Sequence, residues 1–274
     1  MTTILLGLAA GVAWGFADFF GGFASRRMSA AAVAAASQVV GTLIVAALLV
    51  ATRPTLPGWS DLGLGALGGV CGGLGVFAFY RALAIGTISL VAPVSALGAG
   101  IPVAVGLLQG ERPGRIALVG VFVAIAGAVV ASRAPGRATR AGLGMAAVAA
   151  VGFGLFFVLI APAAETSVLW AAFATRASSV PILIVVCLGL RASPRIGRGL
   201  WPFVLGAGVL DIVANMAFAA AAAAGPLAIA AVLAGLYPVA TVVLAQLVLH
   251  ERLSPAQAVG VAAALTGVGL IAAG

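Results

Sequence analysis

The chain has 274 residues, of which 64% are hydrophobic and 7% are charged, and its net charge of +8 rests on 14 arginines without any lysine. An ordinary soluble domain has about 25% charged and about 45 to 50% apolar residues, so this composition excludes a soluble globular protein and predicts a helical membrane protein. The arginines stand mainly between apolar segments, where they set orientation and meet lipid headgroups, so the basic charge does not indicate nucleic-acid binding.

Apolar windows with few charges follow one another along the chain, and each has the roughly 20 residues that a helix needs to cross a hydrocarbon core of about 30 Å. Proline and glycine mark most of the breaks, and Gly86-Thr87 is the tightest of them. The ten windows are residues 3–23, 30–51, 62–82, 88–109, 115–132, 142–161, 168–190, 202–223, 227–248 and 255–273. The sequence therefore predicts an all-α polytopic membrane protein with ten transmembrane helices.

The second half of the chain repeats the first. Residues 7–20 read GLAAGVAWGFADFF and residues 144–157 read GMAAVAAVGFGLFF, with eight of fourteen positions identical at an offset of 137. The segments that begin at Glu111 and Glu251 match in the same way at an offset of 140. We therefore expect two domains, residues 1–134 and 141–274, with five spans each.

Five spans per copy is an odd number, so the second copy enters the membrane from the opposite side to the first. Such inverted repeats are common in secondary transporters, because two similar halves of opposite orientation can open one site alternately to either side of the membrane. The predicted fold is two inverted five-helix repeats around a central cavity, and the predicted mechanism is alternating access.

The placement of arginine predicts the orientation. Connections after odd-numbered spans hold ten arginines and those after even-numbered spans hold three, although the first half alone divides three against three. Because cytoplasmic loops are enriched in arginine and lysine, both termini are expected outside a bacterial inner membrane.

The C-terminal stretch LYPVATVVLAQLVLHERLSPAQAVGVAAALTGVGLIAAG contains Pro238 in the ninth span, the pair Glu251-Arg252 where that span ends, and two glycines in the last helix. The first copy has the matching pair Glu111-Arg112, but Gly98 stands opposite Pro238. With the duplicated five-span unit, this tail resembles the EamA branch of the drug/metabolite transporters over nearly the whole chain. The resemblance implies ten helices in two inverted halves and export of small metabolites. The YddG-type amino-acid exporters are the most similar in size and style.

Ionisable residues inside a membrane are costly and are functional candidates by default. Asp211 and Asn215 stand four apart on one helix face and could receive an ammonium group or a proton; alternatively, Asp211 only pairs with Arg176. Arg176 could instead bind a substrate carboxylate with its guanidinium fork. Asp18 is a further candidate, with an interfacial position beside Arg26 as its alternative.

Aromatic residues with a polar group suit a mixed cavity, and we expect Trp14, Tyr80, Trp170 and Tyr237 to contribute to a substrate site. Trp14 and Tyr237 lie deepest in their spans, although ordinary packing would explain each of them equally well. The pairs Glu111-Arg112 and Glu251-Arg252 close the fourth and ninth spans, so we expect them to have a structural role at the helix ends.

Motifs for nucleotide binding, metal binding and common hydrolases are missing from the sequence, and there is one histidine in the chain. No cofactor and no metal are therefore expected. The hypothesis is a secondary transporter that exports a small metabolite, most simply an amino acid. Proton coupling, with Asp211 as the proton carrier, and facilitated diffusion both fit. A channel or facilitator for other solutes or drugs, and an intramembrane enzyme, are the alternatives.

Overall fold

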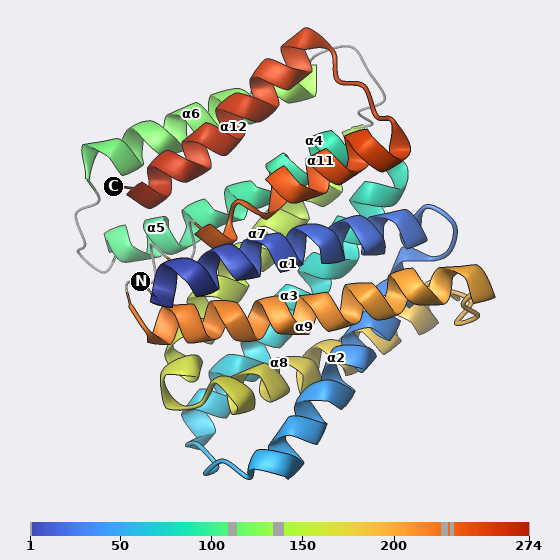
Figure 1. Cartoon of the computed structure of the whole chain (residues 1–274), viewed down its shortest axis with the longest axis vertical. Coiled ribbons are helices and arrows are strands. Elements are labelled where there is room, and N and C mark those ends of the chain that lie inside the picture. The colour runs from blue at the N-terminus through green and yellow to red at the C-terminus, as the bar shows by residue number, and fades with distance from the viewer. Residues whose placement is uncertain (1, 109–113, 134–139, 226–229, 231–232, 274) are drawn as a thin grey trace.

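The structure, a computed structural model of the chain, describes residues 2–108, 114–133, 140–225, 230, 233–273 (Figure 1). Every regular element in these residues is a helix, as expected for an apolar chain whose backbone groups must bond within each segment. The α-helices are α1 (Thr2–Ser25), α2 (Ala30–Thr52), α3 (Trp59–Ile85), α4 (Ile88–Ser95), α5 (Gly100–Leu108), α6 (Arg115–Arg133), α7 (Arg140–Thr166), α8 (Val168–Gly189), α9 (Trp201–Ala223), α11 (Tyr237–Leu249) and α12 (Pro255–Ala273). Two 3-10 turns are also present among these residues, η1 (Ala96–Ala99) and η2 (Arg198–Leu200).

Six of the described helices are long and apolar enough to cross a membrane, and they include α1, α2, α3, α7, α8 and α9. Shorter apolar helices fill residues 88–102 and 237–249. The predicted all-α membrane architecture is confirmed at this level. The number of ten spans stays a prediction, because the ninth expected window falls partly on residues outside the described ranges.

The helices pack crosswise between the two copies of the repeat. Helix α1 lies along α9, and α7, which is the second copy of α1, lies along α3 (Figure 1). Helix α2 likewise contacts α8, its own counterpart. Each half of the chain therefore buries its apolar faces against the other half, and the space between them is lined by both copies.

The pair α6 and α12 forms one edge of the molecule (Figure 1). A Cβ atom added to Gly127 would lie 2.3 Å from the backbone nitrogen of Ala264, and one added to Gly267 would lie 2.3 Å from that of Ala124. These two contacts are equivalent under the offset of 140 residues. Glycine lets the two backbones approach closely, which is how helices associate in lipid without a hydrophobic driving force.

The fourth expected window is interrupted in the structure. Residues 88–109 were expected as one helix, but α4 ends at Ser95, the 3-10 turn η1 follows, and α5 begins at Gly100. Pro93 and Pro102 flank the turn and each removes a backbone donor, which explains why the α-helix does not run through. In the second copy, α11 begins at Tyr237 after a turn at 235–236, which corresponds under the offset of 140 to residues 95–96, where α4 ends and η1 begins. Interrupted helices at matching positions of two repeats are typical of transporter binding regions.

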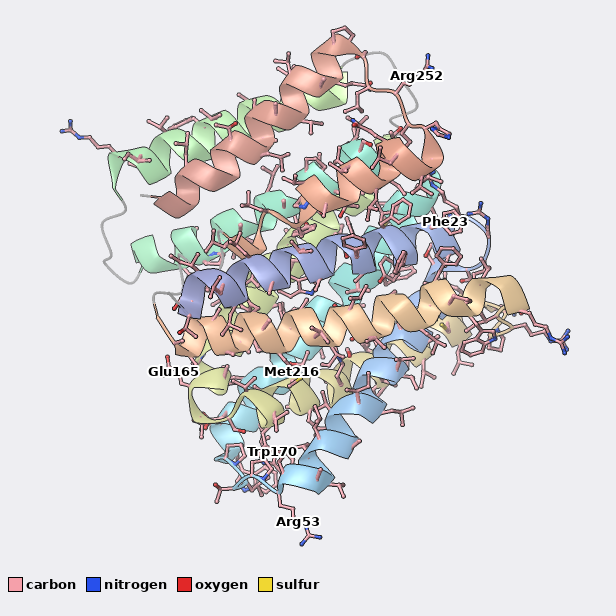
Figure 2. All side chains as sticks on the ribbon, viewed as in Figure 1. Phe23, Arg53, Glu165, Trp170, Met216 and Arg252 are labelled. Atoms are coloured by element: carbon pink, nitrogen blue, oxygen red, sulfur yellow. The ribbon has the colours of Figure 1, made fainter. Side chains whose placement is uncertain are left out.

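The first turn of α1 and the last turn of α12 lie at the same end of the molecule (Figure 1). Figure 2 shows Arg53 and Arg252 pointing away from the helix bundle. The expected pair Glu111-Arg112 lies outside the described residues.

Candidate functional site

A cavity of about 50 Å³ lies between the two halves, bordered by α1, α3, α7, α8, α9 and α11. Its polar lining comes from Asp18, Thr175, Arg176, Asp211, Asn215 and Tyr237. Its apolar lining consists mainly of Trp14 and three phenylalanines of α7, with Gly72, Gly73 and Val76 of α3. The site therefore combines a few polar groups with an aromatic wall, the composition that small-molecule sites share.

Asp211 of α9 is the centre of the polar cluster. Its Oδ2 accepts hydrogen bonds from Arg176 at 2.7 Å and from Gln38 at 3.0 Å. Its Oδ1 accepts from the Trp14 indole at 3.2 Å and from the Asn215 amide at 3.0 Å. All four partners donate, and an ionised carboxylate is a pure acceptor, so the cluster is complementary to a charged Asp211.

Arg176 of α8 is 4% exposed and forms an ion pair with Asp211. Its second terminal nitrogen donates to the Gln38 side-chain oxygen, which also accepts from Ser179 at 3.0 Å. The Arg176 Nε has no hydrogen-bond partner and faces the position of Gly41 on α2, where an added Cβ would lie 3.2 Å away. Asp211 and Gln38 thus occupy the terminal nitrogens of this guanidinium.

Asp18 borders the cavity from α1, one helical turn from Trp14. Within the described part of the chain it forms no hydrogen bond and no ion pair. The sequence left open an interfacial pairing with Arg26, but that guanidinium bonds to Glu251, and Arg27 lies 3.7 Å over the ring of Phe23. Asp18 is therefore a carboxyl group inside the bundle without a protein partner among these residues.

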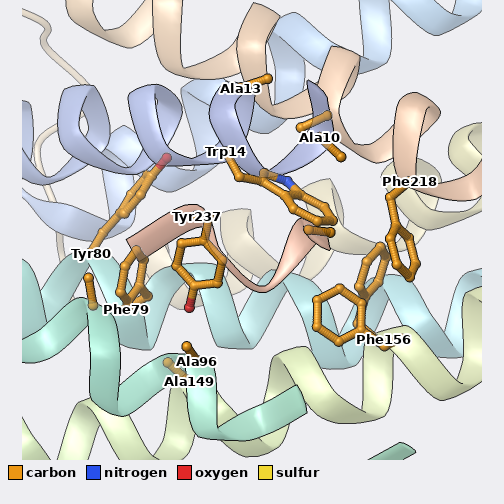
Figure 3. Packing of buried hydrophobic residues seen from close by; sticks show 14 of the residues in the cluster. Ala10, Ala13, Trp14, Phe79, Tyr80, Ala96, Ala149, Phe156, Phe218 and Tyr237 are labelled. Carbon is orange, nitrogen blue, oxygen red and sulfur yellow. The ribbon is translucent and has the colours of Figure 1, made fainter. Parts of the chain in front are cut away.

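Aromatic rings form part of the cavity lining, and Figure 3 shows three of them, Trp14, Tyr237 and Phe156. The Trp14 ring packs against Phe157 and Phe218 with centroid distances of 5.9 Å and 5.7 Å. These contacts hold the indole so that its N–H reaches Asp211. Trp14 has both an apolar contact and a polar partner, the combination that favours tryptophan in a mixed site.

Tyr237 stands at the first residue of α11, and its hydroxyl meets that of Ser95, the last residue of α4, at 2.8 Å. This bond connects the two places where the repeats interrupt their helices. The Tyr237 ring also meets Phe79 edge to face at 6.4 Å (Figure 3). Tyr237 is thus a wall residue and a link between the two halves.

The structure brings together most of the expected substrate residues: Trp14, Asp18, Arg176, Asp211, Asn215 and Tyr237 all border the cavity. Tyr80 is buried in α3 beside Gly21, next to the cavity lining but not part of it. Trp170 lies elsewhere, at the start of α8, where its indole donates to the carbonyl of Pro54. Gln38, which bonds to both Asp211 and Arg176, was not among the predicted residues. An amide side chain within an apolar window is a signal that could have identified it.

Glu251 forms a second polar cluster where α11 ends. Its carboxylate accepts hydrogen bonds from the backbone nitrogens of Ile88 and Ser89 at 3.2 Å and 3.0 Å and from Arg26 at 2.7 Å. Arg26 also donates to the carbonyls of Leu83 and Gly86 at the end of α3. The Glu251 carboxylate thus caps the N-terminus of α4, and the Arg26 guanidinium caps the C-terminus of α3. Both charges are favourable, because a helix carries partial positive charge at its N-terminus and partial negative charge at its C-terminus. Arg252 is exposed beside this cluster.

Crosswise helix pairing between two copies of a repeat, interrupted helices and a polar cluster in an apolar bundle are the features of a polytopic membrane protein of the transporter type. The chain belongs to the EamA-like transporter family, whose model matches twice, over residues 1–133 and 140–273. This family is part of the drug/metabolite transporter superfamily. A solved crystal structure is similar over 98% of this chain and 95% of its own, with a TM-score of 0.70 and 19% identity, a likeness that shows the fold alone. No curated protein sequence matches the chain significantly.

Proposed function

We propose that the chain is a secondary transporter that exports small metabolites, with amino acids as the expected class, across a bacterial inner membrane by alternating access. Membership of a transporter family supports the general class and makes an intramembrane enzyme a poor alternative. The observation that carries the proposal is the cluster around Asp211, which joins side chains of both copies inside the membrane at a cavity between them. Amino acids are expected from the resemblance to YddG-type exporters, which stays a prediction.

The small volume of the cavity favours a moving carrier over an open pore. Sites for small molecules usually measure about 300 to 1,000 Å³, whereas this cavity measures about 50 Å³. A solute of amino-acid size therefore requires the two halves to move apart. The matching interruptions after Ser95 and before Tyr237 are suitable places for such a movement.

The coupling mode stays open between proton coupling and facilitated diffusion. Both oxygens of Asp211 already accept two N–H bonds each, so a proton carried by Asp211 would have to displace one of these donors. Uptake into vesicles with and without an imposed pH gradient separates the two modes. Accessibility of tags at the two ends of the chain in intact cells tests the expected external termini.

The proposal is tested by filling the cavity. Val76 borders the cavity from α3, whereas Leu67 of the same helix is 53% exposed on the surface. We expect saturable solute uptake by the purified protein in vesicles, loss of that uptake in Val76→Trp, and normal uptake in the control Leu67→Trp. A competition screen with amino acids, amines, nucleosides and drugs identifies the solute. Equal uptake by wild type and Val76→Trp would contradict a transport route through this cavity.

A further inference from the structure

Among the described residues that border the cavity, there is one carboxyl group more than there are cations to neutralise it. Asp211 and Arg176 form an ion pair at 2.7 Å, so their charges cancel. Asp18 is the other acidic residue of the lining, and it has no hydrogen bond or ion pair in the described part of the chain. Charges inside a protein are normally paired, and the described residues offer Asp18 no such partner.

A solute carboxylate, in contrast, finds no unpaired cation among the described residues of the lining. Arg176 is the one basic side chain among them, and its charge is neutralised by Asp211. Its Nη2 donates to Asp211, its Nη1 donates to Gln38, and its Nε lies beside Gly41 of α2. An α-carboxylate would therefore have to compete with Asp211 for the guanidinium.

The walls around Asp18 suit a cation with an apolar body. Trp14 lies one turn away on the same helix, and Phe153, Phe156 and Tyr237 face the same cavity. Aromatic faces attract organic cations, more strongly where water is excluded. The aromatic wall and the carboxyl group of Asp18 therefore favour the same class of solute, an organic cation with an apolar body.

We propose that Asp18 binds the ammonium group of the solute, and that the cavity accepts monocationic amines with an apolar body in preference to zwitterionic amino acids and anions. This inference rests on the proposed function, because it names the solute class of the same cavity. Within the broad class of small metabolites, it names amines without a carboxylate as the preferred solutes, in place of amino acids.

The test is direct binding to the purified protein, followed through the fluorescence of tryptophan, since Trp14 lies in the wall. Three probes share one phenyl body: phenethylamine is a monocation, phenylalanine adds a carboxylate, and phenylpropionate has only the carboxylate. At constant neutral pH we expect phenethylamine to bind at least tenfold more tightly than phenylalanine, with phenylpropionate the weakest.

Asp18→Asn keeps the size of the side chain and removes its charge, so it is expected to fold normally and to lose at least tenfold in phenethylamine affinity. Asp18→Glu keeps the charge and should retain most of the binding. Asp61→Asn is the matched control, because Asp61 lies in the first turn of α3, away from the cavity lining. The melting temperature of each variant checks its folding.

Three results would overturn the inference: no binding of phenethylamine to the wild type, binding of phenylalanine as tight as that of the amine, or unchanged amine binding in a folded Asp18→Asn variant. If the wild type took up another solute into vesicles and Val76→Trp did not, that result would still support a transporter. Failure of the amine inference and failure of the proposed function are therefore distinguishable.

Discussion

The hydroxyl groups of Ser95 and Tyr237 meet at 2.8 Å and join the interrupted helix of the first repeat to that of the second. Both residues are buried, at 1% and 5% exposure, so neither hydroxyl has bulk water as an alternative partner. The bond therefore links the two halves at the points where their helices are easiest to bend.

This link should behave as one coupled pair. Tyr237→Phe and Ser95→Ala each remove one hydroxyl, and each is expected to lower stability by about 1 kcal/mol. The double variant should be no less stable than Ser95→Ala, because in that background the Tyr237 hydroxyl has already lost its partner. The Ser95 hydroxyl also donates to the carbonyl of Ala92 at 2.7 Å, so Ser95→Ala should be the worse single variant. Thermal unfolding of the purified variants in detergent measures the coupling, and full additivity would contradict it.

Removing one charge of the ion pair of Arg176 and Asp211 should destabilise the protein more than removing both charges. Arg176→Met leaves Asp211 charged without its counter-ion, and removal of one member of a buried pair destabilises by about 3 to 5 kcal/mol. Adding Asp211→Asn removes the second charge while keeping an acceptor for Trp14, so the double variant should melt at a higher temperature than Arg176→Met.

The matched control for this series is Arg195→Met, because Arg195 is exposed outside the bundle. Its melting temperature should equal that of the wild type. A double variant that is as unstable as Arg176→Met would show that the loss comes from packing and not from the unpaired charge.

The contact of α6 with α12 should not tolerate a methyl group. Gly267→Ala would place a Cβ 2.3 Å from the backbone nitrogen of Ala124, and overpacking of this kind destabilises by about 1 to 3 kcal/mol. Gly269 of the same helix has no atom within 4 Å of an added Cβ, so Gly269→Ala should be neutral or slightly stabilising. Equal melting temperatures of the two variants would disprove the close approach.

The carboxylate of Glu251 should stabilise the start of α4. Glu251→Ala removes the acceptor of two backbone donors and the partner of Arg26, and we expect a loss of about 1 to 3 kcal/mol. Glu165→Ala is the control, since Glu165 is an exposed acidic residue at the end of α7. Thermal unfolding should rank Glu251→Ala clearly below Glu165→Ala, and the opposite order would exclude a structural role for Glu251.

The sequence was sufficient for the helix pattern because membrane helices have a strong signal. A helix in lipid needs a long apolar window, and the described long helices fall on such windows. The turn at Gly86-Thr87 was predicted from two residues, and α3 ends at Ile85 while α4 begins at Ile88. The interruption at η1 was not predicted, although Pro93 and Pro102 stand on either side of it, because proline in an apolar window does not always break the helix. Pro162 of α7 and Pro181 of α8 lie inside continuous helices.

Side-chain partners were harder to predict. The spacing of Asp211 and Asn215 indicated a shared face, and the pairing of Asp211 with Arg176 was one of two alternatives. Gln38 was missed, since its role depends on contacts with residues 138 and 173 positions away. Trp170 has the composition of a cavity residue, but its position at the start of α8 places it against Pro54. Such contacts depend on packing between the halves, which a single sequence does not reveal.

The central claim is that the two halves move a solute by alternating access, and counterflow tests it most directly. Vesicles with the purified protein are loaded with unlabelled solute and diluted into a trace of the labelled solute. A carrier should accumulate the label transiently above its equilibrium level, and Val76→Trp should not. Uptake without this overshoot, together with an ohmic current carried by the solute, would contradict a carrier and identify a channel.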